Sequence, residues 1–231
     1  KGRISQEGAD AAVGRIKTVV TLPDACVAGL VIEAIVEDAT AKRELYSRLE
    51  NIVAPGCILA TNTSSLSITE MASGLEHPER IVGFHFFNPV AIMPLLEIVK
   101  GERTSDEALA TAFATGKALK KTCILVSDSP SFIVNRLLGR FMGEVGRIVD
   151  EGTPLEVADG GFAGVAPMPP FFLLSLVGPA IALHNNETLH GAFPDRFYVS
   201  PNLQELVAAK KSSVYLPDFS VDPEVAEIFR P

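Results

Sequence analysis

The sequence predicts an α/β protein in which a mostly parallel, doubly wound sheet is followed by a separate all-helical domain. Apolar runs of strand length alternate with helical patterns up to about residue 127, and this order is typical of a sheet covered by helices on both faces. After Pro130 the pattern is helical throughout. Apolar residues make up 47% of the 231 positions, enough for a sizeable core. We therefore expect two domains, at residues 1–127 and 128–231.

The patterns of the first domain each have a local reason. Residues 28–35 are a continuous apolar run with one acid, as in parallel strands buried on both faces. Glu37 and Asp38 suit the positive end of a helix, and Pro55 with Gly56 ends it. In chain order we expect a helix at residues 1–17, a short strand at 19–21, the strand at 28–35, the helix from 37, a strand at 57–61, a polar loop at 62–65 and a short helix.

Two further apolar runs, at residues 81–87 and 95–99, are the next expected strands. Thr104 and Glu107 have the spacing of a capping box, so a helix should begin there. The remaining patterns predict a last strand at 122–126, then a long helix at 132–149, helical pieces at 154–162, 171–187 and 202–210, and a peripheral tail at 219–231 with one helical turn.

The composition argues against several classes of partner. A formal charge of −8 disfavours nucleic acid or an anionic membrane as the main partner. No apolar run approaches the ~18 residues of a membrane span, and no signal peptide leads the chain. Cys26, Cys57 and Cys123 are odd in number and scattered, which predicts reduced thiols in a cytoplasmic protein and no metal site.

One histidine lies inside the apolar run at residues 81–87. At strand spacing, His85 shares a face with Ile81, Gly83 and Phe87. Glu97 occupies the next apolar run, twelve residues later. If the two elements face each other, the carboxylate can orient the imidazole and stabilise its protonated form. The alternative is a core hydrogen bond without chemistry.

Polar side chains gather where strands of the predicted sheet end. Ligands of open α/β sheets bind outside the carboxyl ends of the strands, and we expect Glu37, Ser64, His85 with Asn88, and Glu97 at such ends. Together they describe a polar cleft with a base, an orienting acid, and hydroxyl and amide donors. Glu37 or Ser64 could instead be only a helix cap.

Asn135 lies on the buried-looking stripe of the long helix, at steps of three and four with Leu138, Met142, Val145 and Val149. A side-chain amide on such a stripe must find partners. We expect it either to bond a neighbouring loop carbonyl or to point into the cleft between the two domains.

Five segments resemble the L-3-hydroxyacyl-CoA dehydrogenase family in order and spacing, over roughly residues 5–205. They are Glu33-Ala34-Ile35-Val36-Glu37, Asn62-Thr63-Ser64-Ser65-Leu66, Gly83-Phe84-His85-Phe86-Phe87-Asn88-Pro89-Val90, Leu96-Glu97-Ile98-Val99 and Phe132-Ile133-Val134-Asn135-Arg136-Leu137-Leu138. The sequence is similar in style to the dehydrogenase part of multifunctional fatty-acid oxidation proteins.

The resemblance implies NAD-dependent oxidation of an (S)-3-hydroxyacyl-CoA to the 3-ketoacyl-CoA in fatty-acid β-oxidation. It makes His85 the general base and Glu97 its partner, and it has Ser64 and Asn135 hydrogen-bond the reacting oxygens. It also implies a homodimer formed through the helical domain. The positions that match cofactor contacts of the family are Ala34, Glu37, Lys42, Ser64 and Asn88.

The sequence also departs from the family. The opening Gly-x-Gly-x-x-Gly unit is absent, so the resemblance implies an incomplete Rossmann-like sheet with exposed strand edges. Pro169 stands where the family usually has Gly, and Ser175 replaces a common Asp. Two alternatives stay open: a truncated, non-catalytic dimerising fragment that does not bind NAD, and a hydrolase that uses Ser64, His85 and Glu97.

Overall fold

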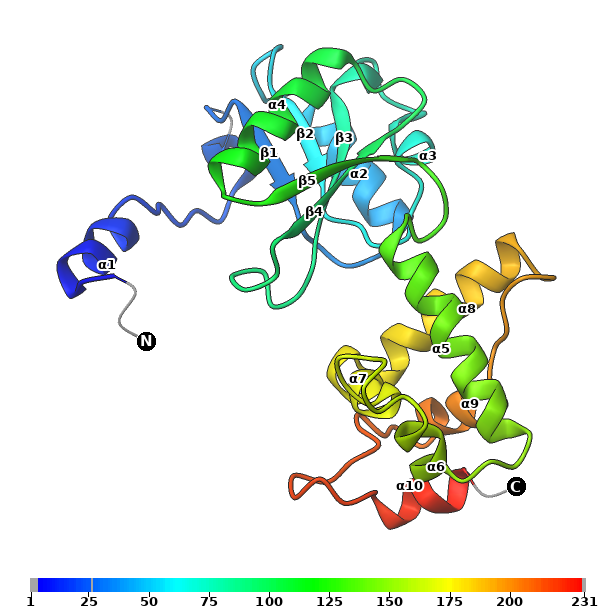
Figure 1. Cartoon of the computed structure of the whole chain (residues 1–231). Helices are drawn as coiled ribbons and strands as arrows, with labels where there is room; N and C mark the ends of the chain where they lie inside the picture. The colour runs from blue at the N-terminus through cyan, green and yellow to red at the C-terminus, as the bar shows by residue number, and fades with distance from the viewer. Residues whose placement is uncertain (1–3, 26, 230–231) are drawn as a thin grey trace. The chain divides into compact units, whose positions relative to one another are not determined.

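The structure of the chain is a computed structural model that describes residues 4–25 and 27–229. The chain forms two compact units (Figure 1). One unit comprises Lys1–Asn62 and Ile68–Cys123, and the other comprises Thr63–Ser67 and Ile124–Pro231. The short polar loop after the second strand therefore belongs to the unit that holds the second half of the chain.

The first half of the chain alternates strands and helices as predicted. Its strands are β1 (Leu30–Glu33), β2 (Ile58–Thr61), β3 (Ile81–Phe86), β4 (Leu95–Lys100) and β5 (Thr122–Ser127), and its helices are α1 (Gln6–Val13), α2 (Ala39–Leu49), α3 (Ile68–Ala72) and α4 (Asp106–Ala118). Short 3-10 helices lie at Leu22–Ala25 and Pro78–Arg80. The strand order is β1-β2-β3-β4-β5. The pairs β1–β2 and β2–β3 are parallel and β3–β4 is antiparallel, so the mostly parallel sheet is confirmed.

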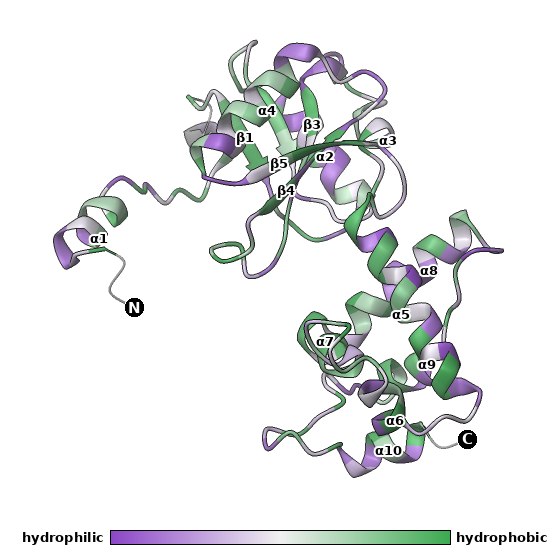
Figure 2. Ribbon diagram, viewed as in Figure 1, coloured by the Kyte–Doolittle hydropathy of each residue, from purple (hydrophilic) through white to green (hydrophobic). Residues whose placement is uncertain are grey.

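Helices cover the two faces of this sheet. One face packs against α4, and its core gathers Ile58, Ala60, Val82, Phe84, Leu96, Ile98, Ala108, Leu109 and Ala112. The other face meets α2 and α3, which bury Tyr46, Leu49, Ile68 and Met71. Figure 2 shows the strands as predominantly hydrophobic ribbons, in keeping with strands enclosed on both sides.

Side-chain caps begin the two longest helices of this unit. The Asp38 carboxylate accepts a hydrogen bond from the Ala41 N–H (2.8 Å) and so starts α2. The hydroxyl of Ser105 accepts from Ala108 N–H (3.1 Å) and starts α4. The capping box predicted from Thr104 is therefore wrong by one residue, because the Thr104 hydroxyl instead donates to the Ile81 carbonyl (2.8 Å).

Two other predictions near the start of the chain need correction. The expected helix at residues 1–17 is shorter, Gln6–Val13, and its first three residues lie outside the described ones. The expected strand at 19–21 is irregular chain. Val20 is fully exposed, and an apolar segment becomes a strand only when a neighbouring strand pairs with it.

Of the cysteines, Cys57 and Cys123 are free thiols whose pKa is raised by burial, and Cys26 lies outside the described residues.

The second half of the chain is helical, as predicted. Its helices are α5 (Val134–Asp150), α6 (Leu155–Gly160), α7 (Pro170–Val177), α8 (Pro179–Ala192), α9 (Pro201–Ala208) and α10 (Pro223–Ile228). The single helical piece expected at 171–187 is wrong: it is two helices, α7 and α8. Gly178 at φ 95° turns the chain between them, and Pro179 has no N–H to continue the first helix. None of the described helices is long and apolar enough to cross a membrane.

The long helix α5 carries glycines on the side where its neighbours approach. A Cβ at Gly139 would lie 2.6 Å from Leu189 Cδ1, and one at Gly143 would lie 3.2 Å from the Tyr198 carbonyl oxygen. Val145 and Val149 continue this helix into the core of the unit. The buried stripe predicted for this helix is thus confirmed at its C-terminal half, while Leu138 and Met142 line a groove described below.

Candidate active site

His85 and Glu97 form a buried pair at the centre of the sheet. Nδ1 of His85 lies 2.7 Å from Oε2 of Glu97, and the two residues are direct partners in the register of β3 and β4. His85 is 5% exposed and Glu97 is fully buried. The Phe87 ring lies beside the imidazole at an interplanar angle of 56°, with ring centroids 4.5 Å apart. The facing arrangement expected from the sequence is present.

The position of Glu97 within its strand differs from the one predicted. We expected it at the carboxyl end of a strand, but β4 runs antiparallel to β3 and Glu97 is its third residue. The start of an antiparallel strand lies beside the end of its neighbour, so Glu97 meets His85 from the opposite chain direction. Gly83 permits the close packing nearby, since a Cβ there would lie 2.5 Å from Val99 Cβ.

The pair fixes which nitrogen of the ring can act as a base. An ionised carboxylate only accepts hydrogen bonds, so Nδ1 of a neutral His85 carries the proton that it donates to Glu97. The lone pair then lies on Nε2, and the carboxylate balances the charge that forms when Nε2 takes up a proton. This arrangement suits general base catalysis.

A second buried polar cluster lies at the end of β1, around Glu33. Oε1 of Glu33 accepts from Lys42 Nζ (2.6 Å) and from the Ile35 N–H (2.7 Å). Oε2 accepts from the hydroxyls of Thr61 (2.7 Å) and Tyr46 (3.2 Å). From the sequence we expected only an acid inside an apolar run, and this cluster was not predicted.

The cluster also reaches two residues predicted to contact cofactor. Lys42 Nζ lies 3.4 Å from Oε2 of Glu37, so Glu37 and Lys42 are brought together. The Lys42 side chain is fully buried, whereas that of Glu37 is 29% exposed. Ala34 lies between Glu33 and Glu37 in the same loop.

Asn62 ties the ends of three strands. Its backbone N–H donates to the Glu33 carbonyl (2.8 Å), and its side-chain oxygen accepts from the Phe86 N–H (2.9 Å). The polar loop follows directly, and the Thr63 hydroxyl accepts from the Leu66 N–H (3.0 Å) to shape the turn that holds Ser64. This is a side-chain turn of the kind that Thr favours.

The loop after β3, which carries Asn88, is held from outside. Lys121 Nζ donates to the carbonyls of Met93 (2.7 Å) and Val90, and it lies 5.9 Å from the centre of the Phe86 ring. Asn88 itself is exposed. Its predicted contact with cofactor stays a prediction.

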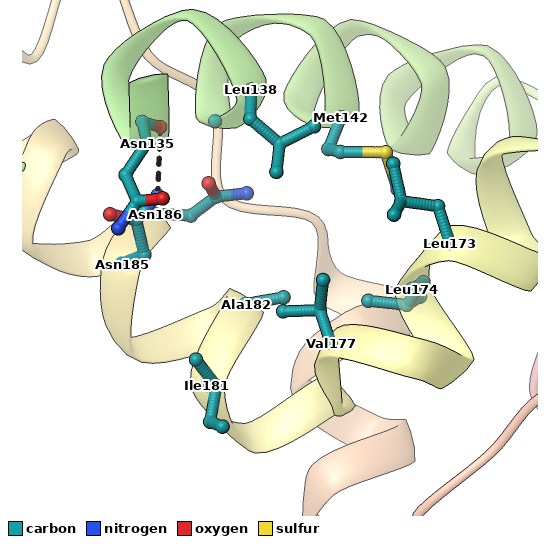
Figure 3. Close-up of a pocket in the computed structure, with 11 residues that line it drawn as sticks. Asn135, Leu138, Met142, Leu173, Leu174, Val177, Ile181, Ala182, Asn185 and Asn186 are labelled. Atoms are coloured by element: carbon teal, nitrogen blue, oxygen red, sulfur yellow. Dashed lines mark hydrogen bonds between the residues drawn. The ribbon is translucent and has the colours of Figure 1, made fainter. Parts of the chain in front are cut away.

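Asn135 lies at the polar end of a groove within the helical unit, between α5, α7 and α8 (Figure 3). The groove is open to solvent, and its empty space, with that open solvent included, is about 420 Å³. Asn185 Nδ2 donates to the Asn135 carbonyl (3.2 Å), and Asn185 Oδ1 is buried without a partner among the described residues. The groove's apolar wall is formed by Leu138, Met142, Leu173, Leu174, Val177, Ile181 and Ala182.

The structure thus brings together two of the predicted groups, His85 with Glu97 and Glu37 with Lys42. Ser64 and Asn135 belong to the second unit, and their approach to His85 stays a prediction. Among the described residues, no group of three or more His, Cys, Asp or Glu side chains could hold a metal ion.

Comparisons with known proteins match both halves of the chain to one family. Residues 1–129 match the model of the NAD-binding domain of 3-hydroxyacyl-CoA dehydrogenase, and residues 132–214 match the model of its C-terminal domain. The fatty acid oxidation complex subunit alpha of Psychrobacter arcticus is 37% identical over 197 residues, which are 85% of this chain and 27% of that protein. The same subunit of Pseudomonas syringae is 38% identical over the same shares.

Solved structures show the same fold. A 3-hydroxybutyryl-CoA dehydrogenase of Escherichia coli K12 is 32% identical with a TM-score of 0.87, over 92% of this chain and 46% of that one. An (S)-3-hydroxybutyryl-CoA dehydrogenase of Ralstonia eutropha is 33% identical with a TM-score of 0.85, over 90% of this chain and 75% of that one.

Fold, paired His and Glu, and family matches together define the class: the chain belongs to the 3-hydroxyacyl-CoA dehydrogenase family, whose N-terminal domain binds NAD. The resemblance noted in the sequence is confirmed. The chain spans 27% of the length of the fatty acid oxidation subunits that it matches.

Proposed function

We propose that this chain carries the proton-transfer site of an NAD-dependent oxidation of (S)-3-hydroxyacyl-CoA to 3-ketoacyl-CoA in fatty-acid β-oxidation. The observation that carries the proposal is the buried 2.7 Å pair of His85 and Glu97 within a chain of this family. Membership of the family favours this reaction over the hydrolase alternative.

In the proposed reaction His85 Nε2 removes the proton of the substrate's 3-hydroxyl group, and Glu97 stabilises the imidazolium that results. Bound NAD would supply the acceptor for the hydride that leaves C3 when the alcohol is oxidised to a ketone. Ser64 and Asn135 hydrogen-bond the reacting oxygens. A positioned base of this kind contributes about 10²–10⁴-fold to the rate.

The residues at the end of β1 fit a dinucleotide. Ile35 and Val36 expose apolar side chains beside the partly exposed Glu37 carboxylate. Apolar surface suits a nucleotide base, and a carboxylate suits the hydroxyls of a ribose. Ala34, Glu37, Lys42, Ser64 and Asn88 would hold the cofactor in this proposal.

The groove beside Asn135 supports an acyl-CoA as the substrate. Its apolar wall suits an alkyl chain, and its polar end offers the buried acceptor Asn185 Oδ1 to a donor of the ligand.

The exposed apolar side chains of Leu176 and Ile181 on α7 and α8 support a homodimer through the helical unit. A cytoplasmic location and the lack of a nucleic-acid partner are part of the same proposal.

The substitution His85→Gln tests the base. We expect NADH formation from a 3-hydroxyacyl-CoA to fall by about 10²–10⁴-fold, because no side chain then takes the hydroxyl proton, while the Kd for NAD stays unchanged. His184→Gln is the matched control, since His184 is exposed on α8. Turnover by His85→Gln equal to that of the wild type would remove His85 from this role.

A further inference from the structure

We propose that Glu33 is a positioning residue: its carboxylate fixes the β1–α2 loop and the Lys42 ammonium in the geometry that NAD binding requires. The inference rests on the proposed function, which assigns Ala34, Glu37 and Lys42 to the cofactor. Glu33 itself lies behind that surface, at 3% exposure.

The carboxylate of Glu33 is fully engaged within the protein. An ionised carboxylate offers about four acceptor positions, and the two oxygens of Glu33 accept four hydrogen bonds. The donors are Lys42 Nζ, Ile35 N–H, the Thr61 hydroxyl and the Tyr46 hydroxyl. No acceptor position is left for a ligand, so Glu33 acts through its neighbours.

Charge balance explains why these donors gather here. A carboxylate buried without partners is strongly disfavoured, and the fully buried Lys42 supplies the opposite charge at 2.6 Å. The two hydroxyls complete the shell of the second oxygen. Burial and the adjacent Glu33 carboxylate raise the pKa of Tyr46 well above its ordinary value, so the phenol stays a donor.

The same contacts shape the loop that faces the proposed cofactor. The bond from Ile35 N–H to Oε1 turns the chain directly after β1, and the Glu33 carbonyl accepts from Asn62 N–H on the neighbouring strand end. Lys42 then holds the Glu37 carboxylate at 3.4 Å. Loosening Glu33 would therefore move the loop backbone, Lys42 and Glu37 together.

Thr61→Val is the sharpest test, because it removes one hydrogen bond to Glu33 and nearly preserves the volume of the side chain. We expect the Kd and KM for NAD to rise about tenfold, the size of a lost hydrogen bond to a charged group, while kcat at saturating NAD changes less than about twofold. Tyr46→Phe should move the same constants in the same direction. Glu33→Gln should have a larger effect on the Kd for NAD, but it removes the negative charge that balances the buried Lys42 ammonium and can therefore destabilise the fold.

Thr104→Val is the matched control. Its hydroxyl is also buried in this unit and bonds the Ile81 carbonyl and the Gly101 N–H, at the beginning of β3. We expect this variant to lower the melting temperature as Thr61→Val does and to leave the Kd for NAD unchanged. Equal constants for Thr61→Val and Thr104→Val would overturn the positioning role.

A readout without cofactor separates this inference from the proposed function. Acylation of Lys42 by acetic anhydride in the free protein can be measured by mass spectrometry. We expect Lys42 of the wild type to resist this labelling. Thr61→Val should raise the labelling rate of Lys42 about tenfold relative to Thr104→Val. A wild-type chain that binds no NAD overturns the proposed function, and the labelling then decides whether Glu33 holds Lys42. Equal labelling of Lys42 in all three proteins would refute the inference about Glu33 alone.

Discussion

Ser131, three residues before the start of α5, combines two local costs. Its φ of 59° lies in the left-handed region, which a residue with a Cβ adopts at a cost of about 1 kcal/mol or more. Its hydroxyl is buried and has no hydrogen-bond partner among the described residues, which adds about 1–3 kcal/mol. The position is therefore better suited to glycine.

The substitution Ser131→Gly should stabilise the protein by about 1 kcal/mol, after the larger chain entropy of unfolded glycine is subtracted. The melting temperature measured by circular dichroism should rise by about 2–4 °C. Ser131→Ala removes only the hydroxyl and should give a smaller gain. A Ser131→Gly protein that melts below the wild type would contradict this reading of the loop.

At the same scale, some contacts could be predicted and others could not. The His85–Glu97 pair follows from strand spacing within two adjacent segments, twelve residues apart. The partners of Glu33 lie nine, thirteen and twenty-eight residues away, on α2 and β2. No local period links such positions, because the fold alone brings them together. The one available signal was the acid itself, since a lone carboxylate in a buried strand must have partners.

The glycines of α5 set how closely its neighbours pack. An alanine at Gly139 would place its Cβ 2.6 Å from Leu189 Cδ1 and 2.9 Å from Asn185 Nδ2. Leu189 is fully buried, so it has little room to move away. Gly191, on α8, has no atom within 4 Å of an added Cβ.

We expect these two helical glycines to respond oppositely to alanine. Gly139→Ala should destabilise the protein by about 1–2 kcal/mol, because overpacking exceeds the gain in helix propensity. Gly191→Ala should stabilise it by about 0.5–1 kcal/mol, since only the propensity changes. Urea unfolding of both variants measures the difference. Stabilisation of the protein by both substitutions would show that the packing of α8 on α5 is looser than described.

Elements with a strong period were predicted better than those that depend on neighbours. The C-terminal half of the α5 stripe and the apolar runs of β2 and β3 were found where expected, because burial enforces the pattern. The segment at 19–21 has a strand-like composition but is not part of the sheet that the described residues form. The break between α7 and α8 was missed because a long apolar run hid the signal of Gly178 and Pro179.

At the scale of the whole molecule, the three tyrosines of the chain lie in different places but in the same kind of environment. Each phenol donates to a carboxylate: Tyr46 to Glu33, Tyr198 to Asp150 and Tyr215 to Asp159. Burial, and then the neighbouring carboxylate, raises the pKa of each. The folded protein therefore keeps its tyrosines protonated at pH values where an unfolded chain would lose those protons.

The pH dependence has a definite sign. Below the ordinary tyrosine pKa of about 10 both states are protonated, and the stability from these contacts is fully present. Above pH 10 the unfolded state binds fewer protons than the folded state, so the free energy of unfolding falls. We expect tyrosinate absorbance to appear together with the loss of helical circular dichroism, and the chain has no tryptophan to obscure it. Tyrosinate formation near pH 10 in a fully helical sample would contradict this prediction.

The loop Thr63–Ser67 shows that the two units are not two consecutive lengths of sequence. It leaves β2 and returns to α3, yet it belongs with the second unit, where the Ser67 hydroxyl donates to the Asp128 carboxylate across 61 positions (2.8 Å). If the protein were expressed as two polypeptides divided between residues 127 and 128, Ser67 and Asp128 would lie on separate chains. Dividing the protein into these halves would therefore remove the Ser67–Asp128 hydrogen bond, and the turn that carries Ser64 would lose this contact with its own unit.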